Sequence, residues 1–87
     1  MGQAYKIPYE DGSVYTGECK NAKPHGKGKL IYGNGNVFEG EFEYGYPKQG
    51  TINYTNGDRY IGEFRDQKHN GNGVFTCKEY RLEGYFE

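Results

Sequence analysis

The chain has 87 residues, with eleven Lys and Arg against twelve Asp and Glu, so its net charge is −1. This balance provides no overall attraction to nucleic acid or to an anionic membrane, and it differs from the large net charge that is typical of disordered chains. Only 33% of the residues are hydrophobic, but ten Tyr and five Phe supply the apolar area that one small domain needs.

The first ten residues, MGQAYKIPYE, lack the apolar core of a secretory signal, and no apolar stretch approaches the roughly 18 residues of a membrane span. We therefore expect a cytoplasmic protein. In that compartment the two cysteines, Cys19 and Cys77, are expected to be free thiols rather than a disulfide. Cys and His do not cluster at the spacing of a metal site, so we expect neither a metal nor another cofactor.

A five-residue motif, apolar at its first position and glycine at its third, recurs along the chain. Its copies begin at residues 15, 38, 60 and 82, at intervals of 23, 22 and 22 residues. The alternation inside each copy predicts a β-strand, and the near-constant interval predicts a stacked repeat array. The predicted organisation is a single domain, residues 1–87, with partial units at 1–14 and 82–87 and full repeats at 15–37, 38–59 and 60–81.

Between the strands, an Asp-Gly or Asn-Gly pair lies among residues that favour β structure. Such pairs tolerate the positive φ that both central residues of a two-residue type I′ turn require. We therefore predict type I′ hairpin turns at Asp11-Gly12, Asn34-Gly35 and Asn56-Gly57.

A second turn is expected at the other end of each unit, in residues 21–28, 43–50 and 66–73. The middle one is a residue shorter between its framing glycines. Pro24 and Pro47, together with His25 and His69, are expected to lie in these loops, where a missing N–H disrupts no ladder. No segment has the apolar period of a helix. The predicted fold is all-β, a single-layer antiparallel meander of repeated hairpins with little or no helix.

Two rows of aromatic residues recur in register with the motif. Equivalent positions lie two strands apart in a meander, at roughly 9.5–10 Å, so their rings could line a continuous groove. They could equally be the core of a chain that has few aliphatic residues, and the sequence leaves both interpretations open. The candidate groove residues are Tyr15, Phe38 and Tyr60 in one row and Tyr9, Tyr32 and Tyr54 in the other.

Charge is distributed unevenly, because residues 15–37 are basic and residues 38–59 are acidic. Each basic residue near an anionic surface contributes about 1 kcal/mol, so four of them predict weak, salt-sensitive lipid binding. The candidate lipid contacts are Lys20, Lys23, Lys27 and Lys29.

An aromatic-x-Gly-Glu string followed about ten residues later by Gly-x-Gly resembles the MORN repeat (membrane occupation and recognition nexus). It is carried by Tyr15-Thr16-Gly17-Glu18-Cys19 with His25-Gly26-Lys27-Gly28, and by Tyr60-Ile61-Gly62-Glu63-Phe64 with Asn70-Gly71-Asn72-Gly73. The middle unit departs from the pattern, since Lys48-Gln49-Gly50 stands where His-Gly-x-Gly is usual, and the chain lacks the Trp that the family often has.

The resemblance implies a twisted sheet of hairpins with an aromatic-lined groove and no catalysis. Arrays of this family are usually scaffold or targeting modules. Phospholipid binding has been attributed to some of them, and protein binding or self-association to others. We therefore expect a non-enzymatic protein-binding module with no small-molecule substrate and no nucleic-acid partner. The alternative is a peripheral module that binds anionic phospholipid through its basic first repeat. Open strand edges at residues 7–9 and 82–86 also predict self-association.

Overall fold

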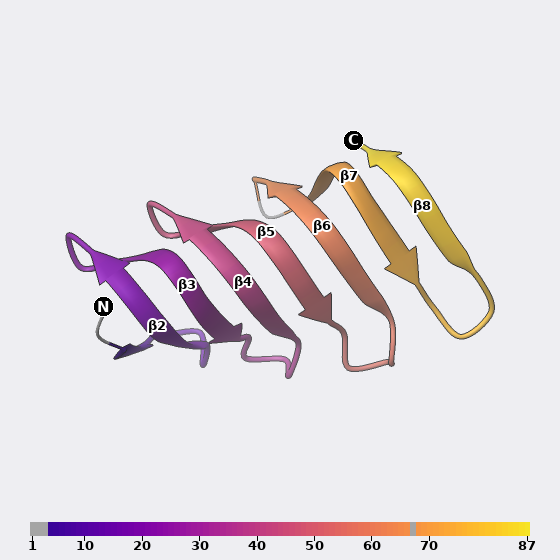
Figure 1. The fold of residues 1–87 in the computed structure, drawn as a ribbon. Helices are drawn as coiled ribbons and strands as arrows, with labels where there is room; N and C mark the ends of the chain where they lie inside the picture. Colours follow the sequence, from indigo (N-terminus) through magenta and orange to yellow (C-terminus); the bar gives the residue numbers. More distant parts are fainter. Residues whose placement is uncertain (1–3, 67) are drawn as a thin grey trace.

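The computed structural model describes residues 4–66 and 68–87. These residues form one antiparallel sheet without a helix, and each strand pairs with its neighbour in sequence (Figure 1). The predicted all-β, single-layer meander is therefore confirmed. The strands are β1 (Tyr5–Pro8), β2 (Val14–Lys20), β3 (Lys23–Ile31), β4 (Val37–Glu43), β5 (Tyr46–Asn53), β6 (Arg59–Arg65), β7 (Lys68–Thr76) and β8 (Arg81–Phe86).

The strands lie side by side along one axis, so the two ends of the chain are at opposite ends of the sheet (Figure 1). The molecule measures 38 × 23 × 22 Å along its principal axes. Within the described residues, no helix has the length and apolar character needed to cross a membrane.

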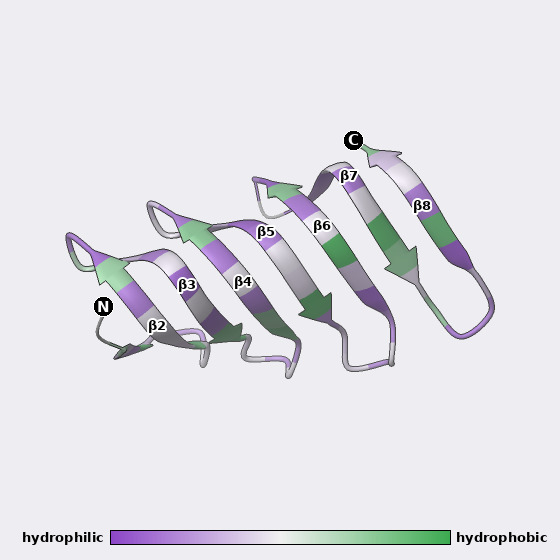
Figure 2. Ribbon diagram, in the orientation of Figure 1, coloured by the Kyte–Doolittle hydropathy of each residue, from purple (hydrophilic) through white to green (hydrophobic). Residues whose placement is uncertain are grey.

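Hydrophobic and hydrophilic residues alternate in bands along the strands (Figure 2). Because successive side chains of a strand point to opposite faces, this alternation gives the sheet one apolar and one polar face. The apolar face carries the whole core, whose buried members are Tyr15, Phe38, Phe42, Ile52 and Tyr60.

Glycines let the core rings lie flat on the sheet. In every pairing from β2 to β8 a glycine faces a glycine, for example Gly17 opposite Gly28 and Gly62 opposite Gly73. A Cβ added at Gly28 would lie within 2.4 Å of the Tyr15 ring. The ring thus occupies the space that a side chain at position 28 would fill, which explains the glycine there.

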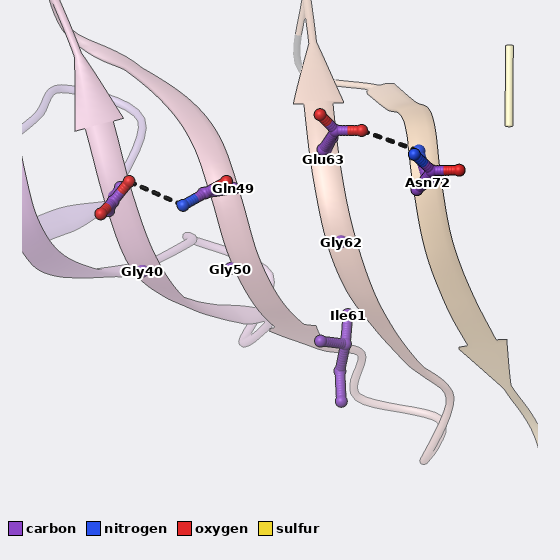
Figure 3. Close-up of a pocket in the computed structure, with 8 residues that line it drawn as sticks. Gly40, Gln49, Gly50, Ile61, Gly62, Glu63 and Asn72 are labelled. Atoms are coloured by element: carbon purple, nitrogen blue, oxygen red, sulfur yellow. Dashed lines mark hydrogen bonds between the residues drawn. The ribbon is translucent and has the colours of Figure 1, made fainter. Parts of the chain in front are cut away.

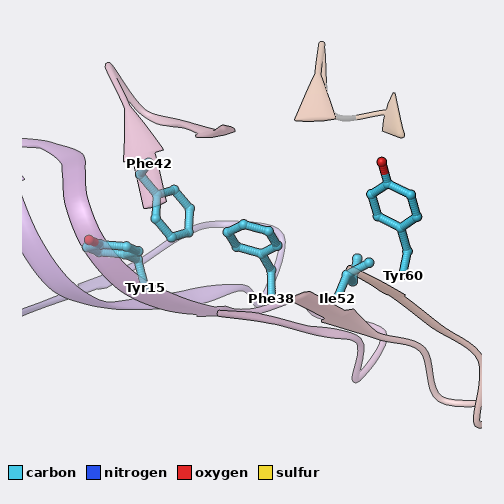
Figure 4. Packing of buried hydrophobic residues seen from close by; sticks show 5 residues of the cluster. All are labelled: Tyr15, Phe38, Phe42, Ile52 and Tyr60. Carbon is cyan, nitrogen blue, oxygen red and sulfur yellow. The ribbon is translucent and has the colours of Figure 1, made fainter. Parts of the chain in front are cut away.

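The aromatic rings form a continuous edge-to-face ladder along the sheet, and its buried members Tyr15, Phe42, Phe38 and Tyr60 are drawn in Figure 4. Each ring contacts the next with centroids 4.9–5.1 Å apart and planes 80–89° to one another, a favoured geometry for aromatic pairs. The ladder therefore supplies a core to a sheet that has no second layer. In order it runs through Tyr15, Phe42, Phe38, Phe64, Tyr60 and Phe86.

The Asx-Gly pairs do form hairpin turns, but the predicted type I′ geometry is wrong. In the first of them the Tyr9 N–H donates to the Ser13 carbonyl, and the Gly12 N–H to the Tyr9 carbonyl. Gly12 has a φ of +91°, whereas Asp11 does not have a positive φ. This is a three-residue loop that ends in a glycine bulge. The Asp11 side chain accepts a bond from the Ser13 N–H at 2.9 Å, which explains the preference for Asp or Asn.

The two-residue type I′ turns lie at the other end of the units, where longer loops were expected. Asn21 and Ala22, with φ values of +51° and +63°, connect β2 to β3. Tyr44 and Gly45, at +48° and +96°, connect β4 to β5. Asp66, at +52°, lies between β6 and β7, and residue 67 is outside the described part of the chain.

The placement of Pro24, Pro47, His25 and His69 in loops is therefore also wrong, since all four lie in strands. Pro24 is opposite Cys19, and Pro47 is opposite Phe42, at points where the register shifts. Such irregular positions are where a strand tolerates proline. The sequence spacing assigned these extra residues to loops. In the structure they lie inside the strands, where β-bulges accommodate them.

Candidate binding groove

The first predicted aromatic row forms the floor of the apolar face. The side chains of Tyr15, Phe38 and Tyr60 are 0% exposed, so they serve as core and a partner cannot reach them in this structure. The Tyr15 hydroxyl donates to the Glu18 carbonyl at 2.6 Å, and the Tyr60 hydroxyl donates to the Glu63 carbonyl at 2.9 Å. Burial, with smaller contributions from nearby negative groups, raises the pKa of Tyr15 to about 12.

The second row lies above this floor and is accessible. Tyr9 is 41% exposed, and Tyr32 and Tyr54 are partly buried. Partial burial raises the pKa of all three phenols, so each is a neutral hydroxyl at physiological pH. These side chains thus present an apolar ring with a polar tip, which suits a contact surface.

A cavity of about 330 Å³ opens between Tyr9 and Tyr32. Its walls combine apolar and polar surface, and its rim carries the Asp11 carboxylate, whose pKa is lowered chiefly by the bonds from Ser13. We call this cavity the Tyr9–Tyr32 groove. It is lined by Tyr9, Asp11, Ser13, Pro24, Leu30, Tyr32, Phe42 and Gly45.

His69 is the main residue of the apolar face that sequence reasoning missed. It stands opposite Phe64, in the place that Pro24 and Pro47 occupy in the earlier units. Its ring stacks on Tyr60, with centroids 3.8 Å apart and planes 7° from parallel. Its Nε2 atom is 2.6 Å from the Tyr54 hydroxyl, and burial lowers its pKa. The strand register, visible only in the fold, placed this histidine on the rings.

The two ends of the accessible row consequently differ. The Tyr54 hydroxyl is bonded to His69, whereas among the described residues the hydroxyls of Tyr9 and Tyr32 make no hydrogen bond to the protein. The N-terminal end of the row therefore has polar groups available for a partner, and the C-terminal end does not.

Two of the four candidate lipid contacts lie opposite glutamates on the adjacent strand. Lys20 and Lys23 lie opposite each other on β2 and β3, next to the turn at Asn21. Lys27 and Lys29 face Glu41 and Glu39 across the β3–β4 pairing. Opposite charges on adjacent strands reduce the positive potential that an anionic surface would meet.

The motif glutamates have a structural task on the polar face. At the bulges the Glu18 carboxylate accepts a bond from the Lys27 N–H at 2.7 Å, and Glu63 accepts one from the Asn72 N–H at 2.8 Å. In the middle unit, where the bulge is smaller, Glu41 instead accepts a bond from the Gln49 side chain at 2.8 Å. A shallow depression of about 530 Å³ follows the glycines between these pairs (Figure 3).

The cysteines and potential metal ligands do not come together within the described residues. Cys19 and Cys77 are free, and no group of three or more His, Cys, Asp or Glu side chains could hold a metal ion in that part of the chain. Burial raises the pKa of Cys19, which disfavours the reactive thiolate.

Comparison with known proteins gives a consistent result. The family model described as MORN repeat matches residues 15–37 and 60–79. Alsin from Homo sapiens and Alsin from Pan troglodytes are each 32% identical over 78 residues, an alignment that covers 83% of this chain. The chain spans only about 5% of the length of these curated relatives.

Proposed function

Because the chain belongs to the MORN repeat family, we propose that it is a protein-binding module that holds an extended peptide segment in the Tyr9–Tyr32 groove. The family is a non-enzymatic repeat module that binds proteins or membranes. Of these two kinds of partner we favour a protein, and we expect the module to act in the cytoplasm.

The observation that carries this proposal is a cavity of about 330 Å³ with two phenol hydroxyls that lack a partner within the described protein. Apolar walls with a few placed polar groups are typical of ligand sites. An apolar side chain of the partner fits against Leu30 and Phe42, while its backbone carbonyls accept bonds from Tyr9 and Tyr32. The ionised Asp11 at the rim favours a basic residue beside that apolar anchor.

The test begins by selecting peptides that bind the immobilised chain from a random displayed library. The selected peptides are then titrated into isotope-labelled protein. We expect chemical-shift changes centred on Tyr9, Leu30 and Tyr32. Tyr is often a binding hot spot, so replacing Tyr9→Ser and Tyr32→Ser together should weaken binding by tenfold or more. The matched control is Tyr80→Ser, an exposed tyrosine at the last turn.

Binding that is equally strong in the double variant, or shifts centred on another face, would refute the groove. Vesicles with and without an anionic lipid form a second arm, at low and moderate salt. The glutamates opposite Lys27 and Lys29 argue against lipid binding. Retention by anionic vesicles that is lost on replacing Lys27→Glu and Lys29→Glu would favour the membrane alternative instead.

A further inference from the structure

The Tyr9–Tyr32 groove has a counterpart in the last repeat, because equivalent residues of the array take the same place in the sheet. Tyr9 and Tyr54 each donate their N–H to the carbonyl four residues later. Pro24 and His69 are each opposite the fifth residue of a motif, and Leu30 and Phe75 are each opposite the first. The counterpart of Tyr9, Pro24 and Leu30 is therefore the set Tyr54, His69 and Phe75.

The imidazole of His69 fills this counterpart. Its ring stacks on Tyr60 with centroids 3.8 Å apart, and its Nε2 atom lies 2.6 Å from the Tyr54 hydroxyl. Three more rings surround it with centroids 5.7–6.0 Å away, those of Phe64, Phe75 and Phe86. The imidazole thus takes both the space and the hydrogen bond that a ligand would take in an open groove.

Proline leaves the first groove open at the same point. Pro24 has no side-chain group that could bond to a hydroxyl, whereas an imidazole has two ring nitrogens. The Tyr9 hydroxyl accordingly makes no hydrogen bond within the described residues, and a cavity of about 330 Å³ lies beside it. The residue at this strand position therefore decides whether the tyrosine hydroxyl above it is available.

We propose that the last repeat carries a second binding site, which the chain keeps closed with its own His69. The present occupant defines the ligand class, because stacking on Tyr60 requires a planar ring and bonding to the Tyr54 hydroxyl requires a polar ring atom. A histidine side chain of a partner peptide has both. Binding of a peptide here rests on the proposed function, whereas the site beneath His69 is testable by itself.

Removing the His69 side chain exposes the site, and free imidazole is the probe. At about pH 8, where most imidazole is neutral, it should bind the His69→Ala variant saturably with a millimolar dissociation constant. We expect chemical-shift changes centred on Tyr54, Tyr60 and Phe75. Adding Tyr54→Phe removes the hydroxyl and should weaken imidazole binding about fivefold. The matched control is His25→Ala, which removes the other histidine of the chain and should create no imidazole site.

The reverse exchange should close the first groove. Pro24→His gives β3 the residue that β7 carries at the same position, so its imidazole should bond to the Tyr9 hydroxyl. Binding of the peptides selected on the wild-type chain should then weaken by about tenfold or more. The matched control is Thr16→His, since Thr16 is exposed and does not line the groove. Thermal unfolding verifies that each variant is folded.

A folded His69→Ala chain that binds no imidazole would overturn the proposal, as would a wild-type chain that shows the same saturable shifts. So would a folded Pro24→His chain that binds the selected peptides as tightly as the wild type does. If no peptide binds the groove of the wild type, the proposed function fails, and the imidazole titration still decides whether His69 covers a site.

Discussion

Exchanging alanine and glycine between two equivalent turns should change stability in opposite directions. Ala22 and Gly45 both occupy the second position of a type I′ turn, with φ values of +63° and +96°. A residue with a Cβ loses roughly 1–2 kcal/mol in the left-handed region, so Ala22 is strained where Gly45 is not. Ala22 is therefore a position where a substitution should stabilise the fold, and Gly45 is its matched control.

The expected magnitudes follow from two opposing effects. Ala22→Gly relieves that strain but increases the conformational freedom of the unfolded chain, which costs about 0.4–1 kcal/mol. The net gain should be about 0.5–1 kcal/mol. Gly45→Ala should cost a similar amount or slightly more. A Cβ there would lie no closer than 4.0 Å to Lys23, so steric overlap adds nothing.

Thermal and urea unfolding measure both changes. For a domain of this size, 1 kcal/mol shifts the melting temperature by about 4–8 °C. Ala22→Gly should therefore raise the melting temperature by several degrees, and Gly45→Ala should lower it. The dependence of the unfolding free energy on denaturant should stay the same, because the core is untouched. A melting temperature that falls for Ala22→Gly would refute the assignment of strain to this turn.

Two further predictions concern the apolar face. Gly28→Ala and Gly73→Ala each place a Cβ within 2.6 Å of a buried tyrosine ring, so each should destabilise the fold by about 3 kcal/mol. The measurement is a fall in the urea midpoint of unfolding. A loss below about 0.5 kcal/mol would contradict the packing of these rings against the glycines. Because burial lowers the pKa of His69, the folded chain resists its protonation, and stability should fall as pH decreases through the ordinary histidine pKa of about 6.5 toward the lower folded value. His69→Phe should remove the loss between about pH 7 and 5, and an unchanged pH profile in that variant would show that another group is responsible.

Several features of this fold can be derived from the chain alone. The recurring motif predicts the strands, their sequential pairing and the sheet without helices, because an alternation of two sets the faces and a fixed interval sets the stacking. The positions of the Asx-Gly hairpins also follow from local chemistry. The aromatic residues needed for a core could be counted, although the sequence left open whether they are core or contact surface.

The tertiary structure decided how those aromatics divide. Tyr15 and Tyr9 look alike in the repeat, but only the first lies over glycines of the adjacent strand and is buried by the neighbouring rings. Burial depends on contacts from other units, so local pattern cannot assign it.

Strand register decided the rest. Bulges absorb the extra residues near His25 and His69, which shortens the expected loops to two residues and leaves Ala22 with a positive φ that its propensity would not suggest. The same register sets His69 on Tyr60. The periodic pattern determined the architecture, and long-range pairing determined which residues remain available to a partner.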